Sequence, residues 1–389
     1  MHTFSERISS LKASAIREIL KHTSNPEIIP FAAGNPAIES FPVEEMAKIS
    51  AEIYRDMPVA ALQYGISEGY TPLRDNTKAR LKEKFNIGGE NDDVIIVSGG
   101  QQGIELTCKV ICNEKDTIIC ENPSFIGALN AFRSYNVNLF GVSLQEDGLD
   151  IEMLENALKT QKNAKMLYLI PTFQNPGGVT ASLEKRKAVY SLAVKYNCFI
   201  LEDNPYAELR FGGEDIPTLK SMDTEGIVIY CGSYSKVMSA GIRIGFVCAN
   251  KDVISKLVVA KQVSDVHTNN FFQILISKYF EQYDFDLHIK KIQELYRNKC
   301  KLMTDGLDKY MADKTTYATP DGGLFIWCTF KEKTDVFEYA KKALEKKTAI
   351  VPGFAFMANE NDYCNSFRLN FSTPTDEQII NGIKLLGEV

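Results

Sequence analysis

The chain has 389 residues, of which 44% are hydrophobic and 24% charged, with a formal net charge of −6. This length can bury one large core or about two domains. The acidic balance argues against a nucleic-acid-binding surface, and no apolar run is long enough to cross a membrane. The polar start, MHTFSERISSLKAS, lacks the apolar core of a secretory signal, so we expect a cytoplasmic protein with neither a membrane nor a nucleic-acid partner.

The nine cysteines are scattered and form no CxxC pair. Cys108 and Cys112 could share one face of a helix, but no second pair would complete a zinc site with them. We therefore expect no metal ion, and reduced, mostly buried thiols as in cytosolic proteins.

The N-terminal part is predicted to form a helix over residues 5–22, because its apolar residues recur at helical spacing. These residues are Ile8, Leu11, Ala15, Ile16, Ile19 and Leu20. The following stretch, PEIIPFAAGNPAIESFP, contains four prolines and is predicted to be extended and rich in turns.

From about residue 94, short apolar runs alternate with helical stretches. The runs are DVIIVS, TIICE, KMLYLIP, FILED, GIVIYC and GFVCA. Helices are predicted from GGQQGIELTCKVIC and PSFIGALNAF. This alternation predicts a mainly parallel sheet covered on both faces, in which ligands bind beyond the carboxyl ends of the strands.

From about residue 270 the pattern changes. A long helical stretch runs from NNFFQILISKYFEQY to LDKYMADK, followed by GGLFIWCTF, a helix around VFEYAKKALEKK, and SFRLNFS. We interpret this part as a second, smaller α+β unit that begins near residue 280.

Two of the predicted strand ends carry groups that suit a charged ligand. After IIVS comes GGQQG, where glycines and a helix N-terminus can bind an anion such as phosphate, although glycine-rich turns are also common without a ligand. After IVIYC comes GSYSK. Desolvation of Lys236 there would lower its pKa and leave a nucleophilic amine, whereas an ordinary lysine is a solvated surface residue.

Two further strand ends carry Asp203, in DNPY, and Asn175, in NPGG. Either could simply cap a helix or stabilise a turn. The four histidines lie outside all these turns, and HExxH, Walker A and GxGxxG motifs are absent from the sequence. An anion cradle, a buried carboxylate, an amide and a lysine of depressed pKa would together serve pyridoxal 5'-phosphate (PLP), which has a phosphate, a pyridine nitrogen and an aldehyde.

The motifs SYSKVMSAGIRIGF, NPGG and DNPY, taken together, resemble those of the fold-type I PLP-dependent aminotransferases, class I/II. The resemblance spans nearly the whole chain. It implies an α/β fold with a large PLP-binding domain, whose mainly parallel seven-stranded sheet is flanked by helices, and a smaller α+β domain. The expected ranges are 1–30 for an N-terminal helix and segment that belongs to the small domain and gates the substrate, 31–280 for the large domain and 281–389 for the small domain.

The resemblance also implies roles for individual residues. Lys236 would form the aldimine with PLP and shuttle a proton, and Asp203 would pair with the pyridinium nitrogen. Tyr206 and Asn175 would hydrogen-bond the 3'-oxygen, and Phe125 would stack on the ring. The phosphate would be held by Gly100, Gln101, Ser233, Ser235 and Arg243.

Substrate and subunit contacts follow from the same resemblance. Arg368, in SFRLNFS, would bind the substrate α-carboxylate, unless it is a surface arginine at a strand edge. Gly34, in the substrate loop FAAGNP, and Asn175 would also contact the substrate. Tyr64, in LQYG, would reach the phosphate of a neighbouring subunit, which implies a homodimer.

SAIREIL followed by IIPFAAGNPAIESFP resembles the 2-aminoadipate, kynurenine and aromatic aminotransferase subgroup. Ser14 and Arg17 match its N-terminal helix, where Arg17 would contact a distal carboxylate or only pair with a local acid such as Glu18. The sequence departs from the pattern at Gly100, where many relatives have serine. It also departs at Ala33 and Asn35, where glycine and leucine are usual.

We therefore expect a homodimeric, ping-pong aminotransferase that passes the amino group of an L-amino acid to a 2-oxo acid such as 2-oxoglutarate. A β-lyase acting on cysteine-type substrates would use the same cofactor residues. A non-catalytic regulator is disfavoured, because only about 30 residues precede FAAGNP, too few for a DNA-binding domain of ordinary size.

Overall fold

The computed structural model describes residues 4–9, 25–359 and 361–389. The α-helices are α1 (Glu6–Ser9), α3 (Val43–Asp56), α4 (Pro58–Leu62), α5 (Thr71–Phe85), α6 (Gly100–Ile111), α7 (Ile126–Arg133), α8 (Ile151–Thr160), α9 (Leu183–Lys195), α10 (Lys251–Gln262), α11 (Asn270–Gln282), α12 (Phe285–Tyr310), α13 (Val336–Glu345) and α14 (Asp376–Gly387). The strands are β1 (Asp92–Val97), β2 (Thr117–Asn122), β3 (Asn138–Gln145), β4 (Gly148–Leu149), β5 (Ala164–Leu169), β6 (Phe199–Asp203), β7 (Val228–Ser233), β8 (Gly245–Asn250), β9 (Thr315–Tyr317), β10 (Phe325–Phe330), β11 (Val351–Pro352) and β12 (Ser366–Asn370). Short 3-10 helices are η1 (Ile38–Ser40), η2 (Ala207–Leu209), η3 (Lys220–Met222) and η4 (Gly353–Phe356).

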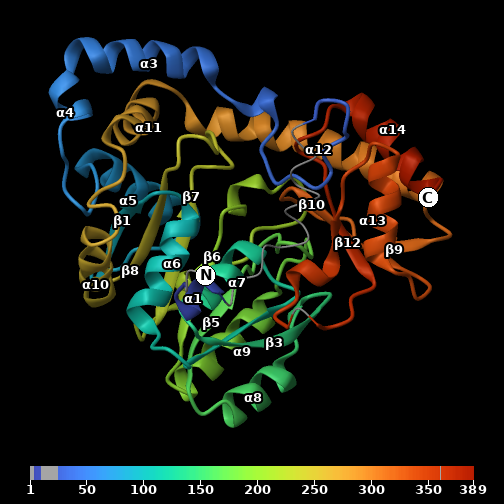
Figure 1. Cartoon of the computed structure of the whole chain (residues 1–389). Coiled ribbons are helices and arrows are strands. Elements are labelled where there is room, and N and C mark those ends of the chain that lie inside the picture. Colours follow the sequence, from blue (N-terminus) through green and yellow to red (C-terminus); the bar gives the residue numbers. More distant parts are fainter. Residues whose placement is uncertain (1–3, 10–24, 360) are drawn as a thin grey trace.

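The larger sheet has the strand order β1-β8-β7-β6-β5-β2-β3-β4 (Figure 1). Strands β7, β6, β5, β2 and β3 are parallel, and β8 runs antiparallel to both of its neighbours, β1 and β7. The predicted mainly parallel sheet is therefore confirmed. Its seven strands are extended at one edge by a two-residue eighth strand, β4.

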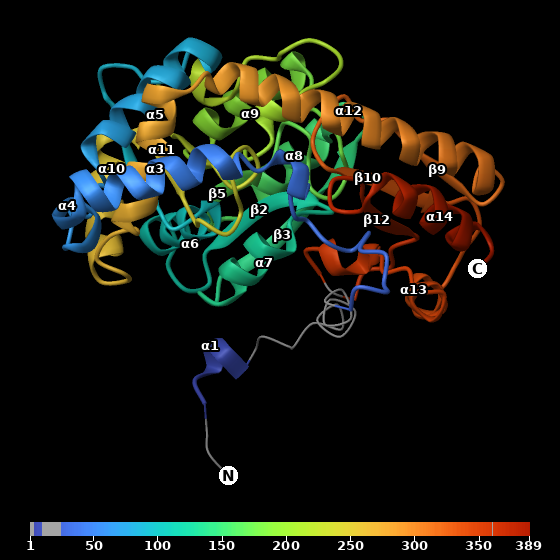
Figure 2. The same ribbon diagram turned by 90° about the horizontal axis from the view of Figure 1, so that it is seen from above.

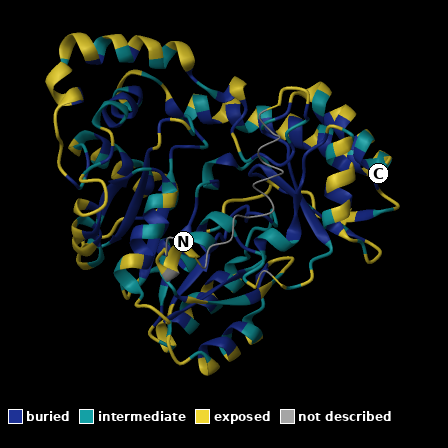
Figure 3. Cartoon of the chain, in the orientation of Figure 1, coloured by how far each residue is buried: buried dark blue, intermediate teal, exposed yellow. Residues whose placement is uncertain are grey.

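Both faces of this sheet are buried because successive side chains on the central strands enter different packing layers. Met166 and Tyr168 of β5 belong to the apolar cluster that contains buried residues of α6 and α7, whereas Leu167 and Leu169 pack with residues of α8 and α9. Figure 3 shows the strands as buried and the outer faces of α3 and α8 as exposed. This two-sided burial explains why the strands appear in the sequence as continuous apolar runs.

A second, antiparallel sheet has the order β11-β12-β10-β9 and lies beside α13 and α14 (Figure 1). The 26-residue helix α12 extends from the large sheet toward this small one, as Figure 2 shows. The single long helical stretch predicted from residue 270 is in fact two helices, α11 and α12. They separate before Asp284, whose carboxylate accepts a hydrogen bond from Leu287 N at 2.9 Å and caps α12. The domain boundaries remain a prediction.

One strand was missed from the sequence, and one predicted helix is described only in part. Strand β3 was not recognised, because its residues are mostly half-buried or exposed and give no apolar run. The helix predicted over residues 5–22 is described only at Glu6–Ser9, and its site candidates Ser14 and Arg17 lie outside the described residues. Within the described parts of the chain, no helix is both long and apolar enough to span a bilayer, and all nine cysteines are free.

Candidate active site

The structure brings most of the predicted polar residues to one edge of the large sheet. The parallel strands end there, so residues far apart in sequence become neighbours. The residues at or just beyond these strand ends are Gly100 after β1, Phe125 after β2, Asn175 after β5, Asp203 in β6 and Ser233 in β7. Arg243 reaches the same edge just before β8 begins.

Lys236 lies in the turn that follows β7. Its Nζ donates a hydrogen bond to the carbonyl oxygen of Gly34 at 2.7 Å, which places the amine against the FAAGNP loop. Burial, together with the nearby cations Arg368 and Arg243, lowers the Lys236 pKa to about 8. A lysine in this state can supply a neutral, nucleophilic amine near neutral pH.

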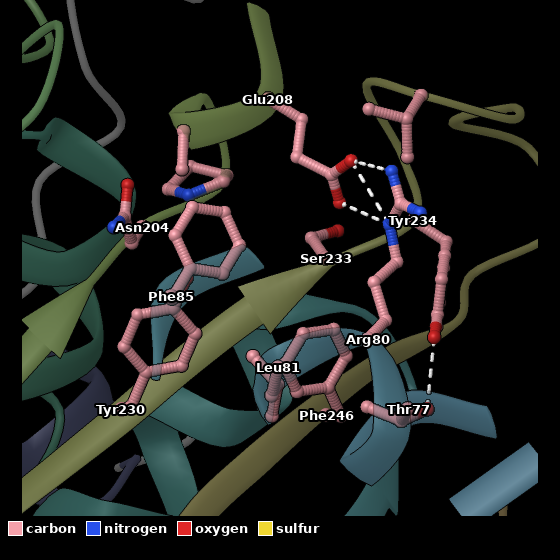
Figure 4. Close-up of a pocket in the computed structure, with 13 residues that line it drawn as sticks. Thr77, Arg80, Leu81, Phe85, Asn204, Glu208, Tyr230, Ser233, Tyr234 and Phe246 are labelled. Carbon is pink, nitrogen blue, oxygen red and sulfur yellow. Dashed lines mark hydrogen bonds and ion pairs between the residues drawn. The ribbon is translucent and has the colours of Figure 1, made fainter. Parts of the chain in front are cut away.

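Tyr234 anchors the turn that carries Lys236. Its ring packs 5.5 Å from that of Phe246, and its hydroxyl lies 2.8 Å from Thr77 Oγ1. Figure 4 shows Tyr234 and Thr77 among the residues that line a small pocket, together with Ser233 and the ion pair between Arg80 and Glu208. Ser233 lines this pocket, but Lys236 and Arg368 do not, so the pocket lies behind the turn and borders the candidate site.

The lowered Lys236 pKa predicts how the protein reacts with an aldehyde. Only the neutral amine attacks, so the rate with free pyridoxal should rise about tenfold per pH unit below pH 8 and level off above it. Absorbance-monitored mixing of cofactor-free protein with pyridoxal between pH 6 and 10 measures this rate. A rate that keeps rising to pH 10, as for a free lysine side chain, would contradict the assigned environment.

Asp203 is buried at the end of β6. Tyr168, from the neighbouring strand β5, donates its hydroxyl hydrogen to Asp203 Oδ2 at 2.7 Å. Burial raises the Asp203 pKa to about 7, although the bond from Tyr168 lowers it. A cationic partner, such as a protonated ring nitrogen, would stabilise the charged form of this buried carboxylate. Tyr168 was missed from the sequence, where it is one apolar-run residue of KMLYLIP.

Asn175 links two other candidates. Its Nδ2 donates to the Tyr206 hydroxyl at 3.4 Å, and its Oδ1 accepts from Arg368 Nη1 at 2.9 Å. The loop carrying Asn175 is held by the buried Glu121, which accepts bonds from Ile170 N at 3.0 Å and Gln174 Nε2 at 3.1 Å. Glu121 was also missed, although a glutamate inside the apolar run TIICE is an unusual feature that could have revealed it.

Arg368, in β12, is buried in the structure, so the alternative of a surface arginine does not hold. Its Nη2 donates to the carbonyl oxygen of Ala32 at 3.0 Å, and its guanidinium lies 4.2 Å from the ring centroid of Phe325. Burial lowers its pKa to about 10. Its Nε has no hydrogen-bond partner among the described residues, so a carboxylate ligand would both satisfy this donor and neutralise the buried charge.

The predicted phosphate end lies where α6 begins. Gly99 has φ +81°, and a Cβ there would lie 2.2 Å from Arg243 Nη2, so only glycine lets Arg243 approach this turn. Arg243 Nη1 donates to Ser235 Oγ at 3.4 Å, and Ser233 Oγ accepts from Ser235 N at 3.1 Å. Backbone N–H groups at the start of α6, together with these side chains, form an anion-binding arrangement.

Three other predicted site residues have weaker links to the site. They are Gln101, Phe125 and Tyr64. Gln101 Nε2 donates to the carbonyl oxygen of Gly127 at 2.8 Å, and the Phe125 ring packs over the same Gly127. Tyr64 is 82% exposed and meets the His267 ring edge-on at 5.8 Å between centroids. The structure thus does not bring Tyr64 into the site of its own chain.

These groups fit one kind of ligand. Arg243 and the first turn of α6 suit a phosphate, Asp203 suits a cationic ring nitrogen, and Lys236 suits an aldehyde. PLP carries all three groups, and Arg368 would take the carboxylate of an amino acid. The geometry is that of a PLP-dependent enzyme acting on amino acids.

Comparison with known proteins gives the family. The model of the family "Aminotransferase class I and II" matches residues 26–386. The chain therefore belongs to the class I and II aminotransferases and is an aminotransferase that uses PLP.

Individual relatives fall in the subgroup indicated by the N-terminal motifs. The chain is 41% identical to aromatic-amino-acid aminotransferase 1 of Thermococcus litoralis, over 99% of this chain and 93% of the relative. It is 37% identical to 2-aminoadipate transaminase of Thermus thermophilus, over 99% and 95%. The crystal structure of Pyrococcus horikoshii kynurenine aminotransferase superposes with a TM-score of 0.95 at 36% identity, covering 99% of this chain and 96% of the other.

Proposed function

We propose that the protein transfers the amino group of an L-amino acid with an acidic or aromatic side chain to a 2-oxo acid, with 2-oxoglutarate as the acceptor, in a ping-pong cycle. The observation that carries this proposal is the closeness of two groups. The Lys236 amine binds the Gly34 carbonyl oxygen at 2.7 Å, while Arg368 binds the carbonyl oxygen of Ala32 in the same loop at 3.0 Å. One small substrate can therefore present its α-carbon to the amine and its carboxylate to the guanidinium.

The residues would divide the work as follows. Arg368 binds and orients the carboxylate common to amino acids and 2-oxo acids, and Asn175 holds the guanidinium in place. Lys236 would hold the cofactor covalently and would move the α-proton of the substrate as a general base and acid. Bound PLP supplies an electron sink for the bond at the α-carbon, which Asp203 supports by holding the ring nitrogen protonated.

The side-chain preference rests on the resemblance and the relatives. The names of the relatives mention aromatic amino acids, 2-aminoadipate and kynurenine. Acidic side chains would bind Arg17 and Ser14, and aromatic side chains would pack against the substrate loop around Gly34. Both Ser14 and Arg17 lie outside the described residues, so this division is supported only by the sequence.

The active form would be a cytoplasmic homodimer. Tyr64 supports this proposal because an 82% exposed tyrosine, together with the exposed Leu62 and Ile66 around it, offers an apolar surface to a second copy. Nine free thiols suit a reducing compartment. A solution mass of twice 43.6 kDa, measured by light scattering, is expected, whereas a monomeric active enzyme would rule out the role of Tyr64.

A titration of the PLP-loaded protein with single amino acids tests the function. With 2-aminoadipate, glutamate, kynurenine or phenylalanine, the aldehyde-derived absorbance should convert to that of pyridoxamine phosphate and return when 2-oxoglutarate is added. Leucine and cysteine extend the panel, and the ranking of rates gives the side-chain preference. Pyruvate released from cysteine without any pyridoxamine form would favour the β-lyase, and absence of change with every amino acid would favour a non-catalytic binder.

A further inference from the structure

A buried ion pair lies next to the candidate phosphate site but belongs to none of the motifs that predict it. Lys261, at the end of α10, has a fully buried side chain, and its Nζ is 2.8 Å from Asp265 Oδ1. The Asp265 side chain is 31% exposed. Burying a lysine is costly in free energy unless its charge is paired. This pair also makes hydrogen bonds to neighbouring side chains.

The ion pair is bonded to both ends of the glycine turn that precedes α6. At one end, Ser98 Oγ donates to Asp265 Oδ2 at 2.8 Å. At the other end, Gln102 Oε1 accepts from Lys261 Nζ at 2.7 Å, and Gln102 Nε2 donates to Asp265 Oδ2 at 2.8 Å. Gln102 Oε1 also accepts from Ser98 N at 2.7 Å. The four side chains therefore close a ring of hydrogen bonds around residues 99–101.

The same ring determines where Arg243 lies. Arg243 Nη2 donates to the carbonyl oxygen of Ser98 at 3.4 Å, and Nη1 donates to Ala240 O at 3.2 Å and Ser235 Oγ at 3.4 Å. These bonds are long and therefore weak. A small rotation of the Ser98 peptide would remove the bond between Arg243 Nη2 and the Ser98 carbonyl oxygen.

Burial and hydrogen bonding shift the pKa values of both members of the ion pair. Burial alone would raise the pKa of Asp265, but the hydrogen bonds from Lys261, Gln102 and Ser98 outweigh burial and lower it. Burial lowers the pKa of Lys261, and the carboxylate of Asp265 opposes this effect. The charged pair is therefore stabilised by the residues that it positions.

We propose that Lys261 and Asp265 are positioning residues for the phosphate group of PLP. Through Ser98 and Gln102 they hold the N–H groups of Gly100 and Gln101 and the Arg243 guanidinium in a phosphate-binding arrangement. This proposal rests on the proposed phosphate site, and neither residue needs to touch the cofactor.

Comparing PLP with pyridoxal, which lacks the phosphate, tests the proposal. Both aldehydes bind the wild-type protein through Lys236, so the ratio of their dissociation constants isolates the phosphate contribution. We expect Lys261→Met and Asp265→Asn to weaken PLP binding at least about tenfold, the effect of perturbing one charge-assisted hydrogen bond. Pyridoxal binding should stay within about twofold of wild type.

Two further variants make the result interpretable. Lys220→Met removes another buried lysine, paired with Asp92 at 2.8 Å and Asp223 at 3.0 Å, away from the phosphate end. This variant should lower the melting temperature. It should leave the ratio of the PLP to the pyridoxal dissociation constant at the wild-type value. Arg243→Met should by itself raise the ratio of the PLP to the pyridoxal dissociation constant. If it does not, the proposed phosphate site is wrong.

The positioning role fails if Arg243→Met raises this ratio of dissociation constants while Lys261→Met and Asp265→Asn leave it at the wild-type value. It also fails if they weaken PLP and pyridoxal equally, because that is the pattern of a purely structural ion pair. If Lys261→Met does not fold, Asp265→Asn and Ser98→Ala test the same proposal. Both residues are partly exposed, so these substitutions remove hydrogen bonds without changing the buried core.

Discussion

Replacing Lys236 with alanine is expected to abolish transamination, with a fall in kcat of more than about 10⁴-fold, because one change removes both the covalent attachment and the proton carrier. The structure indicates that no neighbouring group can substitute. Tyr206 has a pKa raised by burial and by Asp203, and Arg368 is held by Asn175 and the carbonyl oxygen of Ala32. Steady-state turnover with the best amino acid of the substrate panel measures the effect.

The variant should nevertheless fold and bind PLP. Lys236 makes a hydrogen bond to Gly34 O, which contributes about 1 kcal/mol. Removing a buried amine also removes its desolvation cost. Cofactor retained after gel filtration and an unchanged melting temperature are the controls. Near-normal turnover by Lys236→Ala would show that the lysine assignment is wrong.

The strand-end residues could be predicted because each directly follows a buried strand. Runs such as FILED and GIVIYC are apolar since both of their faces are covered, and the chain order alone then places Asp203 and Lys236 at one edge. Strand β3 gave no such run because its side chains are only partly buried. The break between α11 and α12 was missed because a short interruption at Tyr283 and Asp284 does not disturb the apolar spacing.

Supporting residues could not be predicted in the same way. Tyr168 is one aromatic residue within an apolar run, and only the register of β5 beside β6 brings its hydroxyl to Asp203. Lys261 and Asp265 look like surface charges near the end of a helix, and the burial of Lys261 depends on the packing of α10 against α6 and β1. Arg368 was identified through resemblance, because nothing in SFRLNFS itself distinguishes a buried arginine from an exposed one.

Replacing Asp203 with asparagine is expected to lower kcat by about 10²- to 10⁴-fold while preserving the shape of the site. An amide oxygen can still accept the hydrogen bond from Tyr168, but it carries no charge to keep a ring nitrogen protonated. The single-turnover rate with glutamate measures the loss, since it reports the proton-transfer steps apart from product release.

The stability of the cofactor-free Asp203→Asn protein provides the control that separates chemistry from folding. The folded pKa of Asp203 is raised to about 7 from the ordinary value of 3.8. The folded state therefore binds the extra proton between about pH 4 and pH 7, and the wild type loses stability as pH rises through this range. Asparagine has no such dependence, so the variant should melt above the wild type at pH 8 and close to it at pH 5. A slow variant that is more stable at pH 8 would show that the Asp203 charge destabilises the fold and serves the cofactor. A variant that is slow and also less stable at pH 8 would mean that Asp203 holds the structure together, and the electrostatic role would have to be abandoned.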